Sequence, residues 1–257
     1  NPFELVGAIR KGVIDIGNLP GTFYTNIVPE ADALKLVFDP VHKMKNKPIY
    51  GLIEEIHNKK ANAHLLARQK TLVPFHLFVN KSIDVSNANL SNLLKNIKLR
   101  STPIYSPFFK SMGATVVRMA PGEIFTALER GVVDGYGWPL QGIFDLGWQD
   151  ATKMRVDPGF YNSADEILVN LDKWNGLSVK QKSILAAAGK WMEVEGDSKD
   201  LEINANEKKR HQGQGIKVIS LTGEKAKAFR ARSVEMAWKK IIEISPEYGA
   251  RIKKLAQ

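Results

Sequence analysis

The sequence predicts an α/β protein with two interleaved lobes, and three observations support this class. A βαβαβ pattern runs from Lys98 to Leu140, short apolar runs alternate with helical patterns elsewhere, and one helical pattern continues from Ser178 to about Arg210. Because that long helix follows one strand and leads into another, we expect the chain to cross between the lobes more than once.

The prediction of a ligand-binding cleft rests on the segment 98–140. Short apolar or β-branched runs indicate strands at 97–99 and 114–118 and the start of another at 132–133. Helix-start signals indicate helices at 107–112 and 121–129. Parallel strands joined by helices present their carboxyl ends to one crevice, where small ligands bind. Arg100 ends one strand and Trp138 follows another, so we expect both side chains in a cleft that suits an organic carboxylate.

The remaining elements follow in chain order. We expect helices at 1–12, 49–62, 140–153, 178–210 and 222–244, and strands at 13–17, 64–67, 72–79, 167–171 and 216–221. These elements divide into lobe I, residues 1–73 plus 168–212, and lobe II, residues 74–167 plus 213–257. A doubly wound domain seldom opens on a helix, so an N-terminal βαβ unit is expected to be absent from this chain.

The composition is typical of a globular protein with a buried core, because 44% of the 257 residues are hydrophobic and 25% are charged. No apolar run approaches the roughly 18 residues of a membrane span, so we expect no membrane insertion. Zero cysteines exclude disulfides and thiolate metal sites. The first residue is asparagine and no signal peptide is present, so we expect a processed or trimmed product.

The net charge of +10 raises nucleic acid as a partner. The lysines and arginines are scattered, however, and no zinc-finger spacing, RNP-like aromatic motif or glycine-rich arm accompanies them. We therefore expect no nucleic-acid binding, and a basic surface that steers anionic ligands instead.

No motif indicates an enzyme. The chain has no nucleophile elbow, P-loop, dinucleotide-binding glycine pattern or zinc-protease motif. Glu123 is typical of a helix start and Asp134 of a turn after a strand. His57, His64 and His76 lack the spacing of a metal site, so we expect them at the surface or in the core.

Three segments of the chain resemble a known family. The sequences KLRSTP (98–103), GATVVRMAPGEIFTALERGVVDGYGWP (113–139) and DPGFYNSADEILVNLDKWNGL (157–177) are similar to those of the DctP-type substrate-binding proteins of tripartite ATP-independent periplasmic (TRAP) transporters. The resemblance implies a two-lobe periplasmic-binding-protein fold, with hinge strands, a long helix spanning both lobes, and closure over one ligand. It also implies a periplasmic receptor that delivers an organic acid to membrane permease subunits.

The resemblance assigns Arg100 a bidentate ion pair with the ligand carboxylate, for which a guanidinium fork is well suited. A surface charge at a strand end is the alternative. The 2-oxo acid receptors of the family have a tryptophan where this chain has Trp138, and hold a cation with carboxylates where it has Gly137 and Asn162. Sialic-acid receptors place a second arginine near Phe75, which this chain lacks. The expected cofactor is therefore none, with a ligand-bridging cation as the alternative.

The aromatic residues around these positions favour a less polar ligand. With Trp138, Phe160 and Tyr161, we expect a monocarboxylate with an apolar or aromatic body, or a small 2-oxo or 2-hydroxy acid. A place in the lobe core is the alternative for each aromatic side chain. Tyr105 and Asn18 are further candidates, each for a ligand contact or a structural role. A sensing module for a membrane kinase and an enzyme acting on a carboxylic acid are the alternative functions.

Overall fold

The computed structural model describes residues 1–45, 47–85 and 89–256, and the contacts between them divide the chain into two compact units. Unit 1 consists of Asn1–Leu72, Ser163–Leu201 and Ile241–Gln257, and unit 2 of Val73–Asn162 and Glu202–Lys240. The predicted lobes keep residues 213–257 together, whereas here residues 241–257 belong to unit 1. The assignment of residues to two ligand-binding lobes stays a prediction.

Unit 1 contains a three-stranded antiparallel sheet of order β1-β8-β2. Its elements are α1 (Leu5–Arg10), β1 (Ile16–Pro20), η1 (Gly21–Phe23), η2 (Ala31–Leu36), α2 (Val41–Met44), α3 (Pro48–Ala61), β2 (Ala63–Gln69), β8 (Asp165–Asn170), α6 (Leu171–Gly176) and α9 (Gly249–Ala256). The strand predicted at 13–17 lies at 16–20, because the chain bends after Gly12, whose φ is +70°. Asn18 therefore lies inside β1, opposite Ile167, and not in a following loop.

Unit 2 contains a six-stranded mixed sheet of order β5-β4-β6-β3-β7-β9. Its elements are β3 (Pro74–Val79), η3 (Leu90–Asn92), β4 (Lys98–Ser101), α4 (Ser106–Ser111), β5 (Thr115–Arg118), η4 (Pro121–Glu123), α5 (Ile124–Glu129), β6 (Gly135–Pro139), η5 (Trp148–Ala151), β7 (Met154–Asn162), β9 (Lys217–Ser220) and α8 (Gly223–Ile244). β4 is parallel to β5 and β6, which confirms the predicted βαβαβ segment. β3 is antiparallel to both β6 and β7.

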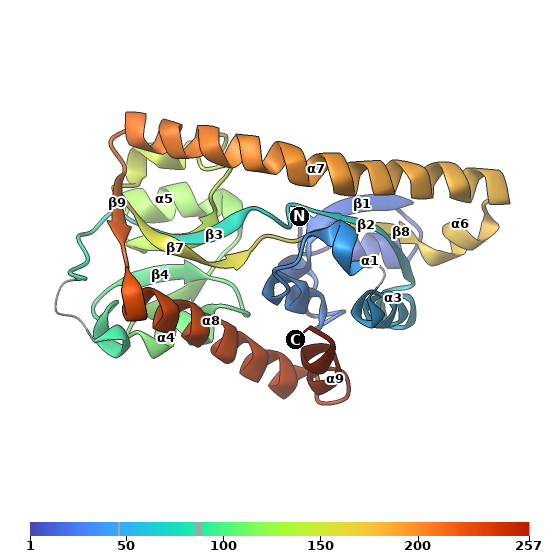
Figure 1. The fold of residues 1–257 in the computed structure, drawn as a ribbon, viewed down its shortest axis with the longest axis horizontal. Helices are drawn as coiled ribbons and strands as arrows, with labels where there is room; N and C mark the ends of the chain where they lie inside the picture. The colour runs from blue at the N-terminus through green and yellow to red at the C-terminus, as the bar shows by residue number, and fades with distance from the viewer. Residues whose placement is uncertain (46, 86–88, 257) are drawn as a thin grey trace. The chain divides into compact units, whose positions relative to one another are not determined.

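Helices cover both faces of the sheet in unit 2, with α4 and α8 on one side and α5 on the other (Figure 1). The core under α5 includes Phe78, Tyr136 and Trp148. The helix predicted at 140–153 is wrong, since only η5 forms there. Gly142 and Gly147 have φ angles of +97° and +70°, which an α-helix does not accommodate.

The predicted long helix is present as α7 (Val179–Gly213), which has 35 residues. Its residues 179–201 belong to unit 1 and 202–213 to unit 2. Gly189 allows close packing on β2, because a Cβ there would come within 3.1 Å of the Leu66 carbonyl oxygen. Trp191, in contrast, is 61% exposed. In the part of the chain that the structure describes, no helix is long and apolar enough to cross a bilayer.

Candidate ligand-binding site

Arg100 is the only predicted site residue whose buried charge requires a partner that the fold itself does not supply. It lies near the carboxyl end of β4, in register with Val117 of β5 and Tyr136 of β6. Only 1% of the residue is exposed to solvent. A buried guanidinium pays a large desolvation cost unless all its hydrogens find acceptors or an anion lies beside it.

The hydrogen bonds of Arg100 satisfy two of its three nitrogens. Nε donates to the carbonyl oxygen of Met119 at 3.2 Å, and Nη1 donates to the hydroxyl of Tyr105 at 2.9 Å. Nη2 is buried and has no hydrogen-bond partner among the described residues. No Asp or Glu of the described residues forms an ion pair with Arg100 either. The free Nη2 therefore suits an anionic group of a ligand.

Trp138 lies in β6, one strand away from Arg100. The guanidinium carbon of Arg100 is 5.5 Å from the centre of the Trp138 ring, within the range of a cation–π contact. The indole also packs edge-on against Trp148, with the ring centroids 4.7 Å apart, and it remains half-buried. The structure thus brings together the two side chains that the sequence singled out.

The other aromatic candidates lie deep in unit 2. The Phe160 ring contacts the rings of Phe75, Tyr105, Phe108, Phe109, Tyr161 and Phe229 and is 1% exposed. The Tyr161 hydroxyl donates to the carbonyl oxygen of Ser233 on α8, at 2.8 Å. These contacts give Phe75, Phe160 and Tyr161 a role in the core, and contact with a ligand stays a prediction for each.

Two asparagines complete the predicted set. Asn162 ends β7 opposite Pro74 and is half-buried. Asn18 is exposed on β1 of unit 1. A ligand contact stays a prediction for both residues.

The position of Gly137 bears on the alternative of a ligand-bridging cation. A Cβ at residue 137 would lie 2.9 Å from Cε2 of Tyr105, so no carboxylate side chain fits there without moving that ring. Asn162 offers a neutral amide. Among the described residues, no three His, Asp or Glu side chains gather in a way that could hold a metal ion. The residues present do not fit a cation at this place.

The sequence analysis did not predict two polar clusters that the structure contains. The first lies in unit 2. Arg155 of β7 donates from Nε and Nη2 to the two carboxylate oxygens of Asp157, at 2.8 and 3.0 Å. Its Nη1 donates to Nδ1 of His211 on α7, at 2.8 Å. His76 contacts the same Asp157 oxygen as Arg155 Nε, at 3.0 Å. The signal that could have indicated this cluster is the sequence MRVDP, which puts two charges into a buried strand.

The protonation of this cluster follows from burial and charge. Burial raises the pKa of Asp157, but the hydrogen bonds from His76 and Arg155 outweigh it and hold that pKa well below its usual range. Burial and the charge of Arg155 lower the pKa of His211 to about 4. The imidazole of His211 is therefore neutral at pH 7 and accepts the hydrogen bond from Arg155.

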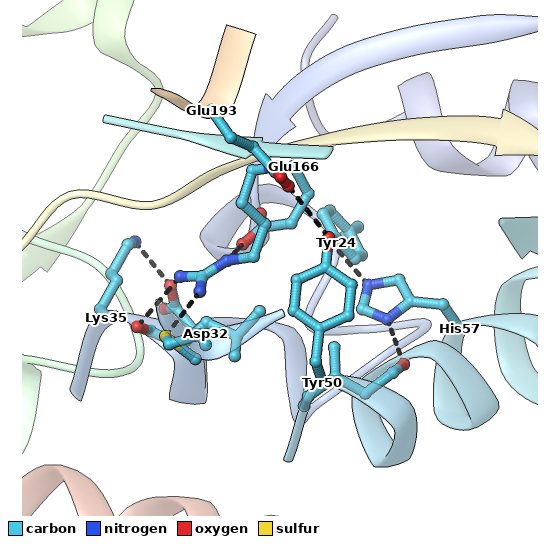
Figure 2. A network of polar contacts seen from close by, with 11 residues as sticks. Tyr24, Asp32, Lys35, Tyr50, His57, Glu166 and Glu193 are labelled. Atoms are coloured by element: carbon cyan, nitrogen blue, oxygen red, sulfur yellow. Dashed lines mark hydrogen bonds and ion pairs between the residues drawn. The ribbon is translucent and has the colours of Figure 1, made fainter. Parts of the chain in front are cut away.

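The second missed cluster is the buried polar network of unit 1, shown in Figure 2. Arg68 of β2 is 1% exposed, and its Nη2 donates to the carbonyl oxygen of Leu34 at 3.2 Å. Its Nε lies 3.9 Å from Oε1 of Glu166 on β8. Nearby, Lys35 pairs with Asp32 at 2.5 Å. Arg68 therefore has a carboxyl group beside it within its own unit.

Three groups of the network, His57, Tyr24 and Glu166, are neutral at pH 7. Nδ1 of His57 donates to the carbonyl oxygen of Ile53 at 2.8 Å, so Nε2 accepts the hydrogen bond from the Tyr24 hydroxyl at 2.9 Å (Figure 2). Burial lowers the pKa of His57 and raises that of Tyr24. Burial also raises the pKa of Glu166 to about 8, because desolvation outweighs the attraction of Arg68. The network holds a proton on Glu166 at neutral pH.

Comparison with known proteins identifies the family. Residues 2–244 match the model of DctP, bacterial extracellular solute-binding protein family 7. The chain belongs to this family, whose members are solute-binding proteins and not enzymes. Both the predicted family and the prediction of a non-enzyme are therefore confirmed.

Two curated relatives are named for the solutes that they themselves bind. The ectoine-binding periplasmic protein TeaA of Halomonas elongata is 25% identical over 162 residues, which are 62% of this chain and 47% of TeaA. The monocarboxylate 2-oxoacid-binding periplasmic protein all3028 of Nostoc sp. is 31% identical over 100 residues, which are 37% of this chain and 27% of that protein. This chain thus aligns with about half, or less, of the length of these relatives.

A solved structure shows the fold. The TRAP periplasmic solute-binding protein of Desulfovibrio salexigens with bound orotic acid superposes with a TM-score of 0.86 at 17% identity, covering 98% of this chain and 82% of that one. The predicted fold class, a mixed α/β protein of the TRAP solute-receptor type with a long helix, is confirmed.

Proposed function

We propose that this chain is the solute receptor of a TRAP transporter and binds a monocarboxylate through Arg100. The observation that carries the proposal is the buried guanidinium whose Nη2 has no partner among the described residues. An anionic oxygen placed there supplies the charge and the acceptor that the fold does not. The family places the receptor outside the cytoplasm, and we propose the periplasm as its location and membrane permease subunits as its partner.

The class of ligand follows from what surrounds Arg100. Trp138 offers a π face beside the guanidinium, and no second unpaired arginine or lysine is buried in unit 2 among the described residues. Arg100 therefore offers a cationic partner to one carboxylate of a ligand, and the described part of unit 2 offers none to a second carboxylate. A 2-oxo or 2-hydroxy acid, or a carboxylate on an apolar or aromatic body, fits this arrangement. The Nostoc relative binds monocarboxylate 2-oxoacids and the Desulfovibrio structure holds orotic acid, which is consistent with the proposal.

Titration calorimetry against a panel tests the proposal. We expect pyruvate, lactate or phenylpyruvate to bind, and succinate, N-acetylneuraminate and ectoine to bind much more weakly. Arg100→Met should weaken binding by about 2–5 kcal/mol, the cost of removing one partner of a buried charge pair. The matched control is Arg130→Met, which removes the same charge from an exposed site in unit 2. Tight succinate or N-acetylneuraminate binding without any response to monocarboxylates would refute the proposed ligand class.

A further inference from the structure

We infer that Tyr105 does not bind the ligand directly but positions Arg100 for it, and that Gly137 makes this possible. The inference rests on the proposed function and assigns two residues to the control of that site. It revises the prediction that Tyr105 is a ligand contact.

The hydroxyl of Tyr105 is fully engaged within unit 2. It accepts from Nη1 of Arg100 at 2.9 Å and donates to the carbonyl oxygen of Gly137 at 3.3 Å. Its single proton is thus used on the backbone of β6, and none remains to donate to a ligand. The hydroxyl therefore connects the guanidinium to the neighbouring strand.

The Tyr105 ring is fixed as firmly as its hydroxyl. It is 1% exposed and packs against the rings of Phe75, Phe109 and Phe160, with centroids 5.3 to 5.8 Å away. A ring enclosed in this way cannot follow a moving guanidinium. Because Nε of Arg100 is held by Met119 as well, only the Nη2 edge is left free for a carboxylate.

Gly137 supplies both the acceptor and the space for this arrangement. A Cβ at residue 137 would lie 2.9 and 3.3 Å from Cε2 and Cζ of Tyr105, and 3.2 Å from Cζ of Phe109. The contact of 2.9 Å is shorter than a Cβ atom tolerates, so the Tyr105 ring would have to shift. Any side chain at this position therefore displaces Tyr105 from Arg100.

A double-mutant cycle tests the inference, with pyruvate and phenylpyruvate as the probes. Tyr105→Phe should raise the dissociation constant about 10-fold, since a hydrogen bond to a charged group is lost. Gly137→Ala should do the same, and the double variant should be no worse than the weaker-binding single variant. In the Arg100→Met background, Tyr105→Phe should have no further effect. Tyr136→Phe is the matched control, because it removes a buried hydroxyl that bonds Thr152 at 2.7 Å.

A second measurement needs no ligand. In NMR spectra of the unliganded protein, rotation about the Cζ–Nη1 bond of Arg100 should be slow, and Tyr105→Phe should accelerate it while Tyr136→Phe does not. Unchanged affinity and unchanged rotation in Tyr105→Phe would overturn the inference, even if Arg100→Met abolishes binding. If no carboxylate binds the wild-type protein, the proposed function fails, and the NMR result alone decides the role of Tyr105.

Discussion

Both units bury arginine side chains, one in unit 1 and two in unit 2 among the described residues, and the three differ in the groups that lie beside them. In unit 1, Arg68 has Glu166 beside it and belongs to a network of carboxyl, hydroxyl and imidazole groups. In unit 2, Arg155 is paired with Asp157, whereas Arg100 has neutral partners only and keeps Nη2 free. A buried arginine with a carboxyl group of its own unit beside it belongs to the fold. A buried charge without one marks a place where the counter-ion comes from outside.

The largest expected effect is on the free energy of unfolding, and it distinguishes Arg155 from Arg100. Arg155→Met should lower the free energy of unfolding by about 3 kcal/mol, because Asp157 loses its bidentate partner. Arg100→Met should lower it by less than about 1 kcal/mol, because no carboxylate is left unpaired. Urea denaturation at pH 7 without ligand measures both values. Equal losses would break the distinction.

The next effect tests the proton on Glu166. Its pKa is about 8 in the folded protein, above the ordinary value of 4.5, so the folded state binds this proton more tightly. Stability from this group is therefore present below pH 4.5 and is lost as the pH rises towards 8. Between pH 6 and pH 9 the wild type should lose roughly 2–3 kcal/mol more than Glu166→Gln. Parallel pH profiles for the two proteins would contradict this assignment.

A smaller effect is expected at Trp138. Trp138→Leu keeps an apolar side chain but removes the π face beside Arg100, so affinity for pyruvate or phenylpyruvate should fall about 5-fold. Trp191→Leu, at an exposed position on α7, should leave affinity unchanged. Calorimetry of both variants measures the contribution of the indole. An unaltered dissociation constant for Trp138→Leu would remove it from the site.

Removing metal ions should leave ligand binding unchanged, which is the smallest of the expected effects. The space of a side chain at 137 is taken by Tyr105, and Asn162 offers only an amide, so no carboxylate cage is available for a bridging cation. Binding after treatment with EDTA, and after adding back Ca²⁺ or Mg²⁺, should match the untreated protein. A loss with EDTA that either cation reverses would show that a metal takes part.

The sequence predicted the parts of this molecule that depend on local pattern. The βαβαβ segment, α7 and the pairing of Arg100 with Trp138 follow from strand ends and apolar periodicity. The helix at 140–153 was wrong because two glycines in left-handed conformation outweigh its apolar spacing. MRVDP could have indicated the pair of Arg155 and Asp157, which share one strand. The remaining partners, His76 of Asp157, His211 of Arg155 and Glu166 of Arg68, lie on other elements far along the chain, so local pattern could not predict them.

The division of the chain into units has a consequence for folding. The buried Glu30 hydrogen-bonds to Ser245, which lies 215 residues further along the chain. Lys59 similarly contacts Tyr248, 189 residues away. Unit 1 therefore closes only when its last segment joins its first, whereas unit 2 is complete by residue 240. Such distant contacts raise the entropy cost of ordering the chain, so we expect unit 2 to fold first and unit 1 to set the overall rate.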